Sequence, residues 1–280
     1  DLFPMIEGAR RQGRPMVTIA QVNGEMPFMY NDAMVRPADF DLVIDHPRYD
    51  FRQFGAPNMP VDNADYMLGL QASALIRDGG TLQIGIGCLG DAIVHFCRVR
   101  QQRNELYNQL LSESHILNHH GDLIGRIGGT GPFERGLYGA SEMFVNGFLH
   151  LYQDGILRRR VYDSAPLQRL LNEGVITETV DERTLRVLLE RGVIPARLTE
   201  ADVGFLRRFG VFNHRVRYQD GELTIDGTQP VPADLDRPES YAAVVADGLG
   251  SHLQGGILMH GGFFMGPQSF YEALRTMPPE

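Results

Sequence analysis

Three glycines between an apolar segment and a helical pattern are the first residues whose spacing suits chemistry. The stretch TLQIGIGCLGDAIVHF, residues 81–96, contains Gly85, Gly87 and Gly90 in the arrangement Gly-x-Gly-x-x-Gly. Glycines at such a junction let backbone amides approach a ligand closely, and the amino end of the following helix favours negative charge. The pattern therefore predicts either an anion-binding turn or a tight turn without a ligand.

A dinucleotide is one ligand to consider for this turn. Binding NAD or FAD requires an acidic residue about 20 positions on, at the tip of a second strand, to hold the ribose. Glu105 stands near that spacing, but its surroundings, RQQRNELYNQLL, are polar and have a helical pattern. Because a lone Gly-x-Gly-x-x-Gly is a weak motif, we do not expect a dinucleotide-binding protein.

A metal site is the second kind of chemistry to consider. In SHILNHHGD, His115 and His119 are four residues apart and His120 follows, a spacing that can place two ligands on one helical face. No third ligand has a fitting spacing, and Cys88 and Cys97 lack zinc-like partners. We therefore expect no bound metal, and we expect reduced cysteines in a cytoplasmic protein.

Composition narrows the classes of partner. The formal net charge is -9, which argues against nucleic acid and anionic membranes as partners. All 26 basic residues are arginine, so a Walker-type phosphate lysine and a Schiff-base lysine are excluded. No apolar run approaches the length of a membrane helix.

The elements that must position the glycines predict an α/β fold. Residues 66–113 suggest a helix, a continuous apolar strand, the glycine turn and a second helix, as in a parallel sheet. Residues 15–23 are expected to form a buried strand, and residues 40–44 a short one. Residues 114–136 have many glycines and no period, which favours a long loop.

The second half of the chain contains clearer signals for the ends of elements. Two helical patterns are each followed by a glycine, Gly192 and Gly210. RVRYQDGELTIDGTQPVP predicts a small β-meander with a hairpin turn at Asp226 and Gly227. SFYEALRTM is expected to begin with a capping box formed by Ser269 and Glu272. No internal repeat is evident.

Four stretches together resemble a known family. They are IAQVNGEMPFM, DGGTLQIGIGCLGDAI, YGASEMFVNGFLHLYQDGIL and MHGGFFMGPQSFYEAL, which span residues 17–274. They are similar to the acetyl-CoA hydrolase/transferase family, the single-chain, glutamate-dependent CoA-transferases. Members of that family are longer, because they have an α/β portion before the asparagine loop and a CoA-contacting glycine loop after FYEAL. The resemblance therefore implies an open parallel sheet with flanking helices that is incomplete at both ends.

The resemblance also implies a division of the chain. Residues 1–62 would be the end of an N-terminal CoA-transferase domain with a connecting loop. Residues 63–280 would be part of the C-terminal CoA-transferase domain, with a helical and β-hairpin insertion at about 165–255.

The same resemblance implies the catalytic residue. Glu142 matches the family's nucleophile, whose carboxylate attacks a thioester and then carries CoA as a glutamyl thioester. Its position before an amphipathic helix is compatible with that role, although a solvated acid at the start of a helix is the plain alternative. Asn23 would orient the substrate carboxylate or the glutamate, or would only form an Asx turn. The expected substrate- and CoA-binding residues are Asn23, Gln83, Gly85, Gly87, Gly90, Gly261 and Gly262.

The implied activity is CoA transfer between a short-chain acyl-CoA and a carboxylic acid, or hydrolysis of acetyl-CoA. CoA would be a substrate, no cofactor would be tightly bound, and the protein would be a cytoplasmic homodimer. Two alternatives stay open: a catalytically incomplete fragment, and a module that only binds CoA or acyl-CoA. A chain without the later glycine loop is expected to bind CoA poorly, because remote contacts to CoA drive thioester transfer.

Overall fold

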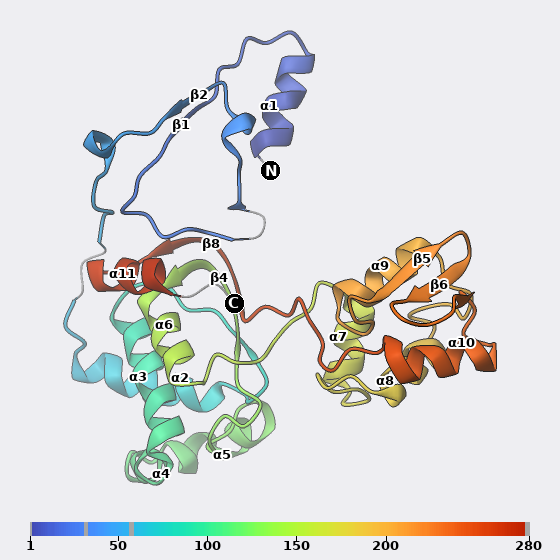
Figure 1. The fold of residues 1–280 in the computed structure, drawn as a ribbon. Helices are drawn as coiled ribbons and strands as arrows, with labels where there is room; N and C mark the ends of the chain where they lie inside the picture. Colours follow the sequence, from blue (N-terminus) through green and yellow to red (C-terminus); the bar gives the residue numbers. More distant parts are fainter. Residues whose placement is uncertain (1, 31–32, 56–58, 278–280) are drawn as a thin grey trace. The chain divides into compact units, whose positions relative to one another are not determined.

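The structure is a computed structural model that describes residues 2–30, 33–55 and 59–277. It divides into two compact units (Figure 1). Unit 1 comprises Asp1–Leu157 and His260–Glu280, and unit 2 comprises Arg158–Met259. Each unit is described separately.

A three-stranded sheet organises unit 1, with the strand order β3-β4-β8. The strands are β3 (Thr81–Leu82), β4 (Tyr138–Val145) and β8 (Met259–Met265). β3 and β4 are parallel, and Leu82 pairs with Gly139. A helix follows each strand: α3 (Cys88–Gln102), α6 (Asn146–Gln153) and α11 (Gln268–Thr276). The expected mixed α/β class, with parallel strands and flanking helices, is confirmed at this level.

The helices α2 (Asn63–Leu75), α3, α4 (Asn104–Glu113) and α5 (Ile116–Ile127) form the apolar core beside this sheet. Asp62 caps α2 by accepting the amide hydrogen of Asp65 at 2.8 Å, which satisfies a donor that the helix cannot. Gly69 lets α2 and α3 approach closely, because a Cβ atom there would lie 2.7 Å from Ala92. The buried side chains of this core are Leu70, Ala74, Phe96, Tyr107, Leu111, Ile116 and Ile124.

The loop expected at residues 114–136 is wrong for its first half, which is α5. Ile116 and Ile124 are buried on one face of this helix. Gly121 and Gly125 face open space, since a Cβ atom at either position would contact nothing within 4 Å. The two glycines lower the helix propensity of the segment, but burial of the apolar face outweighs that cost.

The buried strand expected at residues 15–23 is also wrong. β1 (Ile19–Gln21) and β2 (Leu42–Ile44) form a short parallel pair, and Ile19 is 57% exposed. Parallel strands are buried when helices cover both faces. The ion pair of Arg10 with Asp41 joins α1 (Leu2–Arg11) to this segment, yet no residue of β1 or β2 is buried. The short 3-10 helices of this segment are η2 (Pro37–Asp39) and η3 (Pro47–Tyr49).

Unit 2 contains a threefold repeat that the sequence analysis missed. Its helices are α7 (Ala165–Asn172), α8 (Glu182–Glu190) and α9 (Glu200–Arg208). Each ends at a glycine in the left-handed region: Gly174, Gly192 and Gly210, with φ of 69°, 66° and 70° and a spacing of 18 residues. Each glycine amide bonds the carbonyl oxygen three residues earlier, at 3.0–3.1 Å.

Buried apolar residues recur with the same period. The matching sets are Leu167, Leu185 and Val203; Leu170, Leu188 and Leu206; Ile176, Ile194 and Phe212; and Val180, Leu198 and Val216. The expected glycine stops at Gly192 and Gly210 are confirmed. The repeat was not evident from the sequence because only the glycine and the apolar positions recur, while the polar positions differ.

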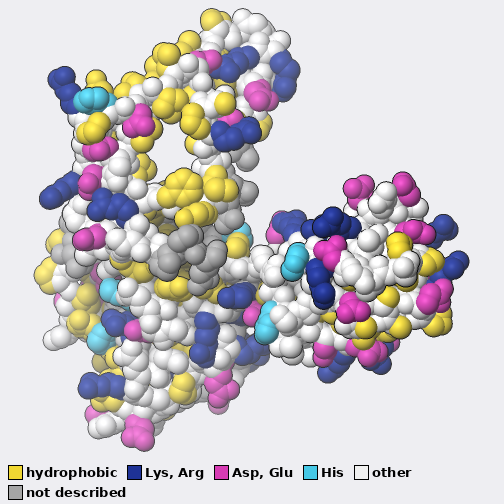
Figure 2. All heavy atoms as spheres, viewed as in Figure 1, with side chains coloured by type: hydrophobic (Ala, Val, Ile, Leu, Met, Phe, Trp, Pro, Cys, Tyr) yellow, Lys and Arg dark blue, Asp and Glu magenta, His cyan; other side chains and the backbone are white. Residues whose placement is uncertain are grey.

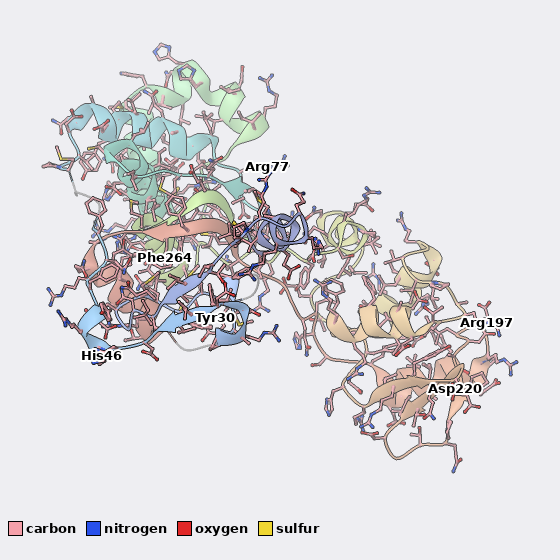
Figure 3. All side chains as sticks on the ribbon, turned by 90° about the horizontal axis from the view of Figure 1, so that it is seen from above. Tyr30, His46, Arg77, Arg197, Asp220 and Phe264 are labelled. Atoms are coloured by element: carbon pink, nitrogen blue, oxygen red, sulfur yellow. The ribbon has the colours of Figure 1, made fainter. Side chains whose placement is uncertain are left out.

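The rest of unit 2 is a β-meander and one helical segment. The strands β5 (Val216–Gln219), β6 (Glu222–Ile225) and β7 (Val231–Pro232) are antiparallel, which confirms the meander. The tight two-residue turn lies at Asp220 and Gly221, both with positive φ, and Asp220 is labelled in Figure 3. Asp226 and Gly227 instead begin the longer connection to β7. The chain then forms α10 (Pro238–Ala243) and the π-helix η4 (Val244–Gly248).

Candidate functional site

The carboxyl end of β3 and the middle of β4 lie side by side. The Ser141 hydroxyl donates to the Ile84 carbonyl oxygen at 3.0 Å. The β3–β4 pairing is parallel, so continuing its register beyond Leu82 places Gly85 opposite Glu142. Neighbouring strands lie about 4.8 Å apart. The start of the glycine turn is therefore expected to lie beside Glu142.

Glu142 lies within β4, three residues before its end, whereas the sequence suggested the junction itself. Its side chain is exposed. Among the residues that the structure describes, no hydrogen bond or ion pair is formed with its carboxylate. The carboxylate is therefore exposed and without a partner among the described residues.

The glycines of the turn have different structural roles. Gly87 is the N-cap of α3 and has a φ of 114°, which an L-residue rarely adopts. Gly90 is inside the first turn of α3, and a Cβ atom there would lie 2.5 Å from the Gly85 carbonyl oxygen. A Cβ atom at Gly85 or Gly87 would contact nothing within 4 Å. Gly85 and Gly87 therefore face open space, while Gly90 keeps the helix close to the turn.

The second glycine segment lies on the other side of β4. Gly261 and Gly262 are exposed residues of β8, the strand next to β4. A Cβ atom at Gly262 would lie 3.3 Å from the Glu142 carbonyl oxygen. His260 is hydrogen-bonded through Nδ1 to the Tyr138 hydroxyl of β4, so it is a satisfied histidine in a strand. Glu142 thus has a glycine segment on each side.

Phe264 and α11 hold β8 in place. Phe264 packs against Tyr271 of α11 with ring centroids 5.8 Å apart, and Figure 3 labels Phe264 on this strand. Gly266 lies against Phe270, since a Cβ atom there would be 2.5 Å from its ring. The capping box expected at Ser269 and Glu272 is wrong, because α11 begins at Gln268 with Pro267 as N-cap and no side-chain cap bond.

The side chain of Asn23 forms hydrogen bonds to the backbone of two nearby loops. Its side-chain oxygen accepts the amide hydrogens of Glu25, at 3.1 Å, and of Phe51, at 3.2 Å. Its side-chain amide donates to the Phe51 carbonyl oxygen at 3.0 Å. These bonds form an Asx turn that joins two loops. Gln83, by contrast, is exposed in the segment between β3 and α3.

A cavity of about 260 Å³ between α3 and α6 contains residues that the sequence analysis did not select. Asp91, His95 and His150 line it together with Asn146, whose side-chain amide lies 3.0 Å from His150 Nε2. Burial raises the pKa of the Asp91 carboxyl, and the nearby His150 acts in the opposite direction. Burial lowers the pKa of the His95 imidazole. Its position directly after Gly90 is the sequence signal that could have identified Asp91 as a residue of this cavity.

The remaining candidates do not form a site. Within residues 2–30, 33–55 and 59–277, no three His, Cys, Asp or Glu side chains are close enough together to hold a metal ion. Cys88 and Cys97 are both free thiols. Glu105 lies in α4 and not at the tip of a strand. No helix of the described chain is both long and apolar enough to cross a bilayer.

Comparisons with known proteins find similarity to a CoA-transferase over part of the chain. No family model matches the sequence. A stretch of 99 residues is 27% identical to the 4-hydroxybutyrate coenzyme A transferase of Clostridium kluyveri, covering 35% of this chain and 22% of that protein. A crystal structure of 4-hydroxybutyrate CoA-transferase from Porphyromonas gingivalis aligns with 52% of this chain and 28% of its own, at 21% identity and a TM-score of 0.31. That TM-score is too low to support an argument. The sequence relationship to a CoA-transferase thus extends over about a third of the chain.

Proposed function

We propose that this chain transfers CoA between an acyl-CoA thioester and a short carboxylic acid, with Glu142 as the nucleophile. The observation that carries the proposal is the place of Glu142 on the central strand, with Gly85 on one side and Gly262 on the other. The similarity to a protein named 4-hydroxybutyrate coenzyme A transferase supports the chemistry. The match covers 22% of that protein, so its whole activity is part of the proposal.

The reaction proceeds through covalent intermediates on Glu142. One carboxylate oxygen attacks the thioester carbonyl, the C–S bond breaks, and an acyl-glutamyl anhydride and CoA thiolate form. The thiolate then attacks the Glu142 carbonyl carbon of the anhydride and releases the first carboxylic acid as its carboxylate. A second carboxylate repeats the sequence in reverse, so that it leaves as an acyl-CoA and Glu142 regains its carboxylate.

The glycine segments stabilise the charge that develops. Each attack places negative charge on a carbonyl oxygen, and we expect a backbone amide at Gly85, Gly87 or Gly262 to donate to it. One such donor contributes about 3–4 kcal/mol to the transition state in enzymes where it has been removed. The lack of side chains at these positions leaves the approach open for the thioester.

The direct test is a search for the glutamyl thioester. Because weak CoA binding is expected, the 280-residue chain is incubated with a large excess of an acyl-CoA without acceptor, treated with borohydride and digested for mass spectrometry. We expect the peptide that contains Glu142 to carry an alcohol in place of the carboxylate, because borohydride reduces a thioester and not a carboxylate. Glu142→Gln should abolish the product, and the exposed Glu105→Gln should retain it. Reduction at another acid, or activity in Glu142→Gln, would refute the assignment.

A second variant tests the glycine turn. Gly85→Ala adds a methyl group in open space, so the fold should be unchanged by circular dichroism. We expect CoA transfer to fall by about 100-fold if the methyl group displaces the ligand from one amide donor. Gly121→Ala, which also points into open space but lies in α5, is the matched control. Equal rates in the two variants would exclude the turn from the site. Release of free CoA without acyl transfer would identify hydrolysis instead.

A further inference from the structure

A basic groove lies at the end of the third helical repeat in unit 2. Its volume is about 720 Å³, and residues 204–215 and 249–254 line it. Four basic side chains contribute: Arg207, Arg208, His214 and Arg215. No aspartate or glutamate is among the described residues of the lining. Figure 2 shows arginine and histidine side chains close together on this unit, whose arginines are otherwise outnumbered by acidic residues.

The floor of the groove is held by close backbone contacts. A Cβ atom at Gly250 would lie 2.0 Å from the Gly210 carbonyl oxygen, so these two loops touch through their main chains. The Asn213 side-chain amide donates to the carbonyl oxygens of Asp247, at 2.7 Å, and Leu249, at 3.1 Å. The groove is therefore formed before any ligand arrives, which lowers the entropic cost of binding.

The basic side chains of the groove keep hydrogen-bond donors that no other described residue of the chain occupies. Arg208 forms an exposed ion pair with Asp163 at 2.7 Å, and Arg215 donates to the Asp247 carbonyl oxygen at 3.0 Å. The side chains of Arg207 and His214 form no hydrogen bond or ion pair with any residue that the structure describes. Such an arrangement leaves several donors available for one anionic group.

The repeat shows that the fold does not require these cations. At the positions 18 and 36 residues before Arg207 the chain has Leu189 and Leu171, and before Arg208 it has Glu190 and Asn172. At the positions that match His214 it has Ala196 and Glu178. The first two repeats form the same helix and the same left-handed glycine turn without counterparts of Arg207, Arg208 and His214, whereas Arg215 has a counterpart in Arg197. The helix and its glycine turn therefore do not require the three cations that occur only in the third repeat.

We propose that this groove binds a small molecule that carries a phosphate or diphosphate group. Guanidinium groups bind phosphate oxygens in pairs of parallel hydrogen bonds, which favours arginine over other cations for this purpose. The volume is in the range of small-molecule sites. A concave site in a chain of net charge -9 suits a small anion better than a nucleic acid strand.

The test measures binding of pyrophosphate to the whole chain by isothermal titration calorimetry at low ionic strength. We expect saturable binding that weakens at least about tenfold in the double variant Arg207→Gln, Arg215→Gln. Arg197→Gln is the matched control, because Arg197 holds the position of Arg215 in the second repeat, does not line the groove and is exposed. Figure 3 labels Arg197. Circular dichroism should show all variants folded.

Two further measurements identify the molecule that carries the phosphate and show whether the groove is independent of the proposed catalytic site. ADP and CoA are titrated in parallel. Tighter binding of ADP than of CoA identifies a free nucleotide, and the reverse identifies the phosphates of CoA. Glu142→Gln should leave pyrophosphate binding unchanged, so failure of one proposal does not affect the other. Absence of saturable pyrophosphate binding, equal loss in Arg197→Gln, or groove-dependent binding of a labelled oligonucleotide alone would overturn the inference.

Discussion

Replacing the buried Arg100 by methionine should destabilise unit 1 more than any surface arginine change. Arg100 is 2% exposed. Its guanidinium donates to the carbonyl oxygens of Gly131, at 2.6 Å, Ser73, at 3.1 Å, and Ile76, at 2.7 Å. It also lies over the Phe133 ring, 4.2 Å from the centroid. One side chain thus joins α3 to the end of α2 and to the loop before β4.

The expected loss of stability in Arg100→Met follows from the three hydrogen bonds of the guanidinium group. A hydrogen bond to a charged group contributes about 1.5–3 kcal/mol net, so three give an upper range of about 4.5–9 kcal/mol. Two effects reduce that range. Methionine removes a charge whose burial is costly, and water can reach the carbonyl of Gly131, which is exposed. We therefore expect the free energy of unfolding to fall by about 3 kcal/mol.

Urea denaturation followed by circular dichroism measures the change, and hydrogen exchange of α2 and α4 peptides assigns it to unit 1. Arg126→Met makes the same chemical change at an exposed position of α5 and should stay within about 0.5 kcal/mol of the parent. Exchange in α8, which belongs to unit 2, should not change. The reasoning fails if Arg100→Met loses less than about 1 kcal/mol or if Arg126→Met loses as much.

Three further predictions concern single groups. Burial raises the pKa of Cys97 to about 12, so DTNB at pH 8 should modify one thiol, the partly exposed Cys88, and two after denaturation. Gly128→Ala should destabilise by about 2 kcal/mol, because the new Cβ atom would lie 2.0 Å from a backbone oxygen, whereas Gly125→Ala in open helix should stabilise by about 0.5–1 kcal/mol in urea melts. Asp91 has a raised pKa, so the folded state binds its proton more tightly and its contribution to stability falls as pH rises from its unfolded pKa through its folded pKa. Asp91→Asn should therefore gain stability over the parent at pH 7 and lose that advantage near pH 3; an unchanged difference across that range would contradict the assignment.

The sequence predicted the helix ends correctly where a residue type is required by the local backbone conformation. Gly192 and Gly210 marked helix ends correctly, because a left-handed residue is needed there whatever the surroundings are. It failed where the tertiary contacts decided the outcome. Ser269 and Glu272 have the spacing of a capping box, yet Pro267 is the N-cap and the helix begins at Gln268, one residue before Ser269. The segment of α5 has two glycines within its pattern, and only the burial of Ile116 and Ile124 shows why it is helical.

The glycine motif illustrates why a spacing alone could not define the candidate site. Gly85, Gly87 and Gly90 are equivalent in the sequence pattern, but each has a different structural environment. Gly90 is needed because its helix turn touches the Gly85 carbonyl oxygen, and Gly87 because its φ is 114°. Both constraints exist without a ligand, so they explain the motif as a tight turn. Gly85 alone has neither a close neighbour nor a positive φ. The absence of a side chain there has no structural reason within the described residues, and it lies opposite Glu142 in the continued register of β3 and β4. The proposed function of the motif therefore depends on Gly85, and the Gly85→Ala variant tests it directly.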